Sequence, residues 1–94
     1  MWLEKTNEII NFLATQPIIK NYTMVGGSAL SYWLKHRYSE DIDLFTGDNI
    51  LKIIQINNLI NNIKNKYKVN LLLEDDKIHL DYAINNVKVI FCAS

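Results

Sequence analysis

The most informative segment of the sequence is residues 26–45, GGSALSYWLKHRYSEDIDLF. It opens on two glycines, continues with a helical pattern of apolar residues, and ends on Asp41 and Asp43. The segment DIDLF alternates, which predicts a short strand with Ile42 and Leu44 on one face and both aspartates on the other. Neighbouring carboxylates repel each other unless a cation lies between them, and oxygen ligands favour Mg²⁺ or Mn²⁺. The pair therefore predicts a divalent metal site.

The glycine pair, Gly26 and Gly27, leads into a second predicted feature. The segment SALSYWLKHR predicts a helix with Ser28 as its N-cap. The N–H groups and the dipole of a helix N-terminus favour phosphate binding. One helix then separates this turn from the aspartates, which allows both to lie at the same edge of a sheet. Singly, a glycine pair is more often a turn and Asp-x-Asp a solvated strand edge. Their combination predicts a site for a nucleoside triphosphate with Mg²⁺.

The remaining pattern predicts helices before and after this stretch. An amphipathic helix is expected from Trp2 to Thr15, where Pro17 ends it, followed by a short strand centred on residues 22–25. A further helix is expected within residues 48–67, capped by Asp48. Its predicted buried stripe consists of Ile50, Ile53, Ile54, Leu59, Ile60 and Ile63.

The last third of the chain changes to a period of two. Three strands are expected, at Val69–Leu73, Lys77–Ile84 and Val87–Cys92. Asp75-Asp76 and Asn85-Asn86 are expected to form the tight turns between them. The order of elements predicts one α+β domain over residues 1–94, a mixed β-sheet with helices packed mainly on one face.

Composition excludes several classes of protein. The 94 residues carry a formal net charge of zero, so no global basic field attracts nucleic acid. The single cysteine, Cys92, cannot form an intramolecular disulfide and is expected to be a buried, inert thiol rather than a reactive one. No segment has the pattern of a signal peptide or the roughly 18 apolar residues of a membrane span. A cytoplasmic location is predicted.

The segment Val25–Phe45 resembles nucleotidyltransferases of the AbiEii/AbiGii toxin type, in the DNA-polymerase-β-like superfamily. The shared features are the glycine pair, a small hydroxyl residue, Ala-Leu, a helix ending in His-Arg, then Ser and Asp-x-Asp. Outside this segment only the order of strands and helices matches. The resemblance implies a minimal nucleotidyltransferase fold and a metal-dependent transfer of a nucleoside monophosphate from an NTP, with pyrophosphate leaving. It also implies a toxin-antitoxin or phage-defence setting, with RNA, tRNA or protein as the acceptor.

The resemblance assigns roles to individual residues. It implies that Gly26, Gly27 and Ser28 hold the triphosphate. Asp41 and Asp43 would bind the catalytic Mg²⁺ or Mn²⁺, which orients the triphosphate and stabilises developing charge.

Two alternative roles are predicted for the basic residue Arg37. Its guanidinium would contact a phosphate oxygen, or it would form a structural ion pair with Glu40 or an aspartate. His36 and Ser39 are expected to fix the loop before the aspartates.

One residue departs from the family pattern. A third carboxylate is expected on a later strand in a VKVD-like setting, but NVKVIF places Ile90 there. If Asn85-Asn86 is a two-residue hairpin turn, Asp81 lies opposite Ile90 on the same face. Asp81 then either partly replaces the missing acid or is a solvated strand residue. His79 would lie on that face too, opposite Cys92.

The length of the chain is a second departure. Larger members carry a helical domain beyond the sheet, and this chain shows none, as expected of a minimal version that works with a partner or of a shortened descendant. The last strand is predicted to be an open sheet edge that invites pairing in a homodimer. The predicted partners are an NTP, an RNA acceptor and an antitoxin or helical partner protein. The alternative is a catalytically impaired nucleotide-binding or interaction protein of the same fold.

Overall fold

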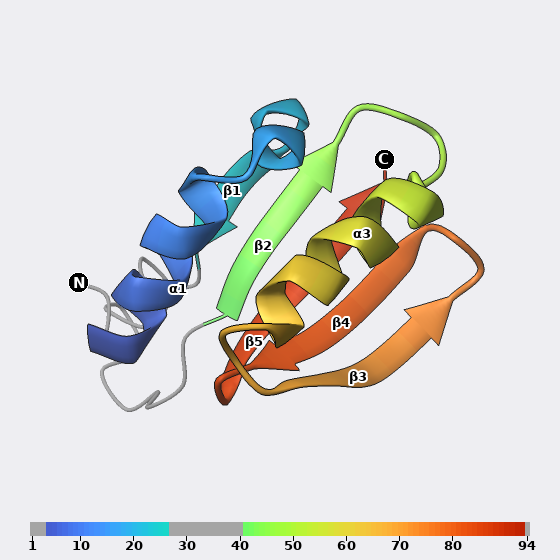
Figure 1. The fold of residues 1–94 in the computed structure, drawn as a ribbon. Coiled ribbons are helices and arrows are strands. Elements are labelled where there is room, and N and C mark those ends of the chain that lie inside the picture. Colours follow the sequence, from blue (N-terminus) through green and yellow to red (C-terminus); the bar gives the residue numbers. More distant parts are fainter. Residues whose placement is uncertain (1–3, 27–40, 94) are drawn as a thin grey trace, which may run out of the picture.

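The computed structural model describes residues 4–26 and 41–93 of the chain. The helix predicted from Ser28 onward, with Gly27 and Arg37, lies outside the described residues, as do His36 and Ser39. Figure 1 shows the described elements as helices in front of one sheet. In chain order the elements are α1 (Glu4–Ala14), the 3₁₀-helix η1 (Pro17–Asn21), β1 (Thr23–Gly26), β2 (Asp41–Thr46), α3 (Ile53–Lys64), β3 (Val69–Asp75), β4 (His79–Ile84) and β5 (Val87–Ala93).

The five strands form one mixed sheet in the order β1-β2-β5-β4-β3. β5 runs parallel to β2, whereas the pairs β1–β2, β4–β5 and β3–β4 are antiparallel. α1 and α3 cover the same face of the sheet in Figure 1, α1 beside β1 and α3 across β5 and β4. The α+β class and the helices on one face confirm the prediction.

The position of β5 corrects one expectation. We expected the last strand to be an open edge, but β5 lies between β2 and β4. Its inward residues Val87, Val89 and Phe91 are almost completely buried, and Ile90 and Cys92 on the other face are partly buried. Such near-continuous apolar character is typical of a central strand. Within the described residues, β1 and β3 form the edges instead.

The first helix forms where its pattern predicts. Thr6, Ile9 and Leu13 recur at helical spacing and are buried against the sheet. Pro17 does not only end the helix, because it also begins η1, which we did not predict. Proline fits this first position because its missing N–H would have no partner within the helix.

The helix after β2 is shorter than predicted. α3 begins at Ile53, its N-cap is Lys52, and Asp48 caps nothing. Asp48 instead donates its backbone N–H to Thr46 Oγ1 and lies 4.0 Å from the Lys52 ammonium. The predicted buried stripe is therefore wrong at its beginning: Ile50 and Ile54 are 56% and 78% exposed.

The two hairpin turns differ in their agreement with prediction. Asn85 and Asn86 have φ values of 52° and 65°, as a two-residue type I′ turn requires, which confirms that turn. The β3–β4 turn lies one to two residues later in the sequence than the predicted Asp75-Asp76 turn. It comprises residues 76–78, with positive φ at Asp76 and Lys77, and β4 begins at His79 rather than Lys77.

The core fills the space between the helices and the inner face of the sheet. Phe91 lies at its centre, where Tyr22 and Tyr82 contact its ring edge-to-face at centroid distances of 5.7 and 6.0 Å. The buried residues of the core are Ile9, Leu13, Ile19, Ile42, Leu44, Leu51, Ile56, Leu59, Ile60, Ile63, Leu80, Tyr82, Ile84, Val87, Val89 and Phe91.

Candidate active site

The face of the sheet opposite the helices carries the candidate site. Side chains alternate along each strand, so the residues between the buried ones face this side. We call it the polar face. Its described residues are Asp41, Asp43 and Phe45 of β2, Lys88, Ile90 and Cys92 of β5, and His79, Asp81 and Ala83 of β4.

The strand register aligns three site positions in one row across the sheet. Asp43 of β2 pairs with Ile90 of β5, and Ile90 pairs with Asp81 of β4. The predicted position of Asp81 opposite Ile90 is thereby confirmed. Neighbouring strands lie about 4.8 Å apart, so the backbones of the two aspartates are about two strand spacings apart.

The beginning of the predicted phosphate turn lies on the next strand. Gly26 ends β1 and pairs with Ile42, the residue between the two aspartates. The glycine pair therefore begins on the strand next to Asp41 and Asp43, beside the first residues of β2. Gly27, Ser28 and Arg37 of the predicted nucleotide site are outside the described residues.

Among the residues that the structure describes, Asp81 has two charged or ionisable partners. His79 Nε2 lies 2.5 Å from Asp81 Oδ1, and the Lys88 ammonium lies 3.8 Å from Asp81 Oδ2. The residue is only 6% exposed. A buried carboxylate is stable only when it is paired and hydrogen-bonded, which both neighbours provide. The reading of Asp81 as a solvated strand residue is therefore wrong.

His79 also connects Asp81 to Cys92. Cys92 Sγ lies 3.5 Å from His79 Nδ1, and the two residues are paired across β4 and β5, as predicted. Cys92 is partly buried rather than fully buried. Burial, followed by the nearby charges of Asp43 and Asp81, raises the pKa of its thiol. Since the thiolate is the nucleophile, this environment favours the unreactive form.

Asp43 lies in an environment that disfavours its own negative charge. Partial burial raises the pKa of its carboxyl most, and the charges of Asp41 and Asp81 raise it further. Lys88 and His79 lower the pKa and offset part of this effect. A carboxylate held among other carboxylates is stabilised by an added cation.

The donors on β2 fit a hard divalent cation. Asp41 and Asp43 are partly exposed carboxylates two residues apart on one strand, the ligand type that Mg²⁺ and Mn²⁺ prefer. Across residues 4–26 and 41–93, no group of three or more His, Cys, Asp or Glu side chains is arranged to hold a metal ion. The described carboxylates thus offer part of a metal site, and the metal itself remains a prediction.

Lys88 is the residue of the polar face that sequence reasoning missed. It is paired with Asp41 across β2 and β5, and its ammonium approaches Asp81. The signal was available, because the alternation of VKVIF places Lys88 and Ile90 on the same face. Lys88 therefore supplies a positive charge among three aspartates.

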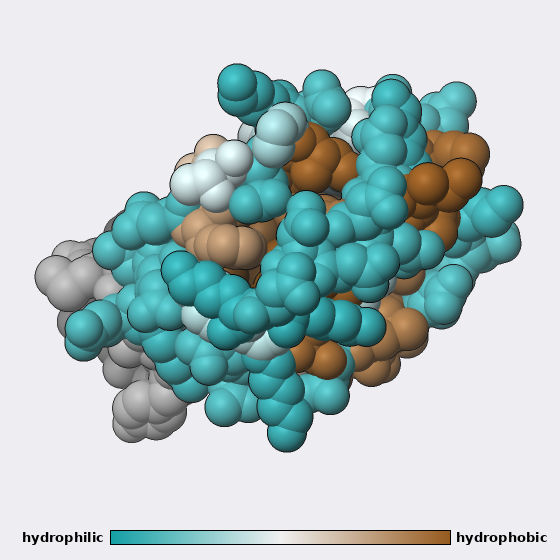
Figure 2. Space-filling model, in the orientation of Figure 1, coloured by the Kyte–Doolittle hydropathy of each residue, from teal (hydrophilic) through white to brown (hydrophobic). Residues whose placement is uncertain are grey.

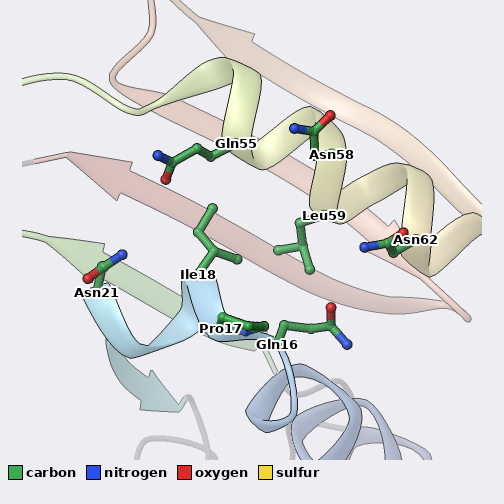
Figure 3. A pocket seen from close by; sticks show the side chains of 8 residues that line it. All are labelled: Gln16, Pro17, Ile18, Asn21, Gln55, Asn58, Leu59 and Asn62. Carbon is green, nitrogen blue, oxygen red and sulfur yellow. The ribbon is translucent and has the colours of Figure 1, made fainter.

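A pocket among the described residues lies away from these carboxylates. The pocket has a volume of about 380 Å³ and lies between η1 and α3, on the helix side of the sheet (Figure 3). Amide side chains and apolar groups line it: Gln16, Pro17, Ile18, Asn21, Gln55, Asn58, Leu59 and Asn62. The sheet separates it from the polar face, so it forms no part of the candidate site.

The described elements form an α+β fold with two aspartates on one strand, and a comparison with family models identifies the class of protein. The model described as "Nucleotidyl transferase AbiEii toxin, Type IV TA system" matches residues 11–89, most of the chain. The protein belongs to this AbiEii family. Searches of curated proteins and of solved structures gave no match. Family membership indicates an antitoxin partner. Among the described residues, no helix is long and apolar enough to cross a membrane.

Proposed function

We propose that the protein is a metal-dependent nucleotidyltransferase of the cytoplasm that transfers a nucleoside monophosphate from an NTP to an acceptor. The observation that carries the proposal is the row Asp43–Ile90–Asp81, with Gly26 beginning the phosphate turn on the adjacent strand. The acceptor is a hydroxyl group of RNA, including tRNA ends, or of a protein. A cognate antitoxin would counteract this activity.

The reaction is an in-line displacement at the α-phosphorus. The acceptor oxygen forms a bond to the α-phosphorus while the bond to the β-phosphate oxygen breaks and pyrophosphate leaves. Asp41 and Asp43 would hold Mg²⁺ or Mn²⁺, which would supply stabilisation of the charge that develops at the attacking and leaving oxygens. Gly26, Gly27 and Ser28 would hold the triphosphate, and Arg37 would contact a phosphate oxygen.

Asp81 supplies the third carboxylate in this proposal. Ile90 cannot accept a proton or bind a metal, whereas Asp81 lies beside it in the same row. The hydrogen bond from His79 and the charge of Lys88 hold the Asp81 carboxylate in place. The acceptor hydroxyl would release its proton to this carboxylate.

One observation favours a second candidate, a nucleotide-binding protein of the same fold with impaired catalysis. Lys88 places an ammonium 3.8 Å from Asp81, where it satisfies the charge that would otherwise serve the acceptor or a metal. Such a protein would bind the triphosphate without transferring the nucleotide, and binding would serve an interaction with a partner.

Calorimetric titration with each of the four NTPs, in Mg²⁺ or Mn²⁺, tests the site first. Metal-dependent binding is expected for the wild type and is expected to be lost in Asp43→Asn. Asp48→Asn is the matched control, because Asp48 is exposed beyond the end of β2 and its loss should leave binding unchanged. No binding by folded wild-type protein would contradict both candidates for the isolated chain.

A transfer assay then separates the two candidates. NTP labelled at the α-phosphate is incubated with RNA, tRNA or protein, and label in the acceptor is measured. Asp81→Asn should still bind the triphosphate but lose about 100-fold or more in transfer, because several kcal/mol of transition-state stabilisation would be removed. Binding without any transfer by the wild type would favour the impaired protein.

A further inference from the structure

The outer edge of β3 is an apolar strand edge without a strand partner among the described residues. β3 is the last strand of the sheet and pairs there only with β4. Three consecutive leucines, Leu71, Leu72 and Leu73, are each about half exposed, at 53%, 54% and 49%. Figure 2 shows brown atoms on the side of the molecule where β3 lies in Figure 1. An unprotected strand edge of this kind invites pairing with another strand.

A bulge in β3 places Leu71 and Leu73 on opposite faces of the sheet, although residues two apart on a regular strand share a face. The pairing with β4 moves from Leu71–Tyr82 directly to Leu73–Asp81, so Leu72 is the extra residue. Leu71 thus lies on the helix side and Leu73 on the polar face. A bulge and charged side chains are two separate features that protect a strand edge from pairing. Here the centre of the strand is apolar.

The charges beside these leucines are separated by sign. Three exposed lysines come before β3 in the sequence: Lys64 ends α3, Lys66 lies in the turn after it, and Lys68 directly precedes β3. We call them the basic block. Exposed acids end it, at Glu74, Asp75 and Asp76, and we call them the acidic block. Lys77 follows the acidic block within the turn. A strand with one basic end, an apolar centre and one acidic end is complementary to an antiparallel copy of itself.

We propose that two copies of the chain pair through antiparallel β3 strands about a two-fold axis, which extends the sheet across the dimer. The two-fold axis passes near the leucines, so that they pack against their counterparts. Each basic block then lies beside the acidic block of the partner, twice by symmetry. The charge pattern selects the antiparallel copy, because a parallel copy would bring like charges together. The polar face of each copy continues onto the other, so both candidate sites lie on one surface.

The experiment uses two variants with opposite charge changes. The acidic variant is Lys66→Glu/Lys68→Glu, and the basic variant is Glu74→Lys/Asp75→Lys. Sedimentation equilibrium over a wide range of concentration should show a dimer for the wild type. Each variant alone should dimerise at least about tenfold more weakly than the wild type, because like charges then oppose each other at both ends of the strand pair. An equimolar mixture should recover the dimer, because both ends of β3 are then mainly basic in one variant and mainly acidic in the other.

A control and a fold check keep the result interpretable. Lys5→Glu/Lys20→Glu makes the same charge change as the acidic variant at exposed positions on α1 and η1, and should dimerise like the wild type. Far-ultraviolet circular dichroism shows whether each variant is folded, since Lys66 also lies over the Phe12 and Tyr67 rings. A wild type that stays monomeric at every concentration would overturn the proposal, as would a mixture of folded variants that stays monomeric. Neither measurement requires a nucleotide, so the proposal stands or falls separately from the enzymatic function.

Discussion

The two faces of the sheet are built from the same strands and have opposite properties. The helix side holds almost fully buried apolar side chains, such as Ile42 and Phe91. The polar face holds Asp43 of β2 and Asp81 of β4, and the positive charge of Lys88 comes from β5, which lies between these two strands. Burial of apolar surface on the helix side stabilises the folded state, whereas repulsion between like charges on the polar face destabilises it. Stability and chemistry therefore depend on alternate residues of one strand, and substitutions can separate them.

The largest effect is expected from the apolar side of β5. Phe91→Ala removes a ring that is completely buried and contacts Tyr22 and Tyr82 edge-to-face. We expect the free energy of unfolding to fall by about 3–5 kcal/mol, because the lost burial is added to the cost of a cavity. Urea denaturation measures this change.

A matched variant on an exposed isoleucine provides the control for Phe91. Ile54→Ala changes an apolar residue that is 78% exposed on α3, and unfolding should change by less than about 0.5 kcal/mol. Similar losses for both variants would contradict the division between a buried apolar side and an exposed surface.

The next largest change in the free energy of unfolding is expected from a substitution in the turn between β4 and β5. Asn86 has a φ of 65°, a conformation that strains a β-branched residue. Asn86→Val should lower the free energy of unfolding by about 1–2 kcal/mol, as measured by the same urea titration. Asn86→Gly is the control and should be neutral or stabilising, because glycine adopts this conformation freely. Equal stability of both variants would mean that the turn does not fix the register that places Asp81 opposite Ile90.

Local pattern predicted the parts of this structure that local rules control. The Asn85-Asn86 turn, counted outward, placed Asp81 beside Ile90 and His79 beside Cys92, and both pairs are present. The alternation of β2 likewise predicted which residues are buried. These rules act over a few residues, so the sequence states them directly.

Tertiary packing decided the parts that were wrong. The insertion of β5 between β2 and β4 depends on strands far apart in sequence, and no local signal gives that order. Ile50 and Ile54 continue a helical apolar pattern, yet α3 begins only at Ile53. The predicted register and the alternation of β5 placed Lys88 and Asp81 on one face, but the approach of the Lys88 ammonium to Asp81 depends on how the side chains pack in the folded protein.

The smallest effect is expected from the charge of Asp43, and it has a defined dependence on pH. Burial and the charges of Asp41 and Asp81 raise the pKa of Asp43 in the folded protein above the ordinary value of 3.8. The folded state therefore binds this proton more tightly than the unfolded state does. The resulting stabilisation is complete below the unfolded pKa and is lost as pH rises through the raised, folded pKa. Asp43→Asn has no such proton, so its stability relative to the wild type should increase over that range of pH.

Thermal unfolding of both proteins from pH 3 to pH 7 measures this difference, which should stay below about 1 kcal/mol because the site is partly solvated. Asp48→Asn makes the same change at an exposed carboxylate outside the polar face and is the control for removing one negative charge. Added Mg²⁺ should stabilise the wild type above the raised pKa and leave Asp43→Asn unchanged, because a bound cation offsets the repulsion among the aspartates. A wild type that gains stability relative to Asp43→Asn as pH rises would show that a positive group, such as Lys88, already outweighs that repulsion. The negative charges of the aspartates would then already be neutralised within the polar face, which would argue against a cation-binding site there.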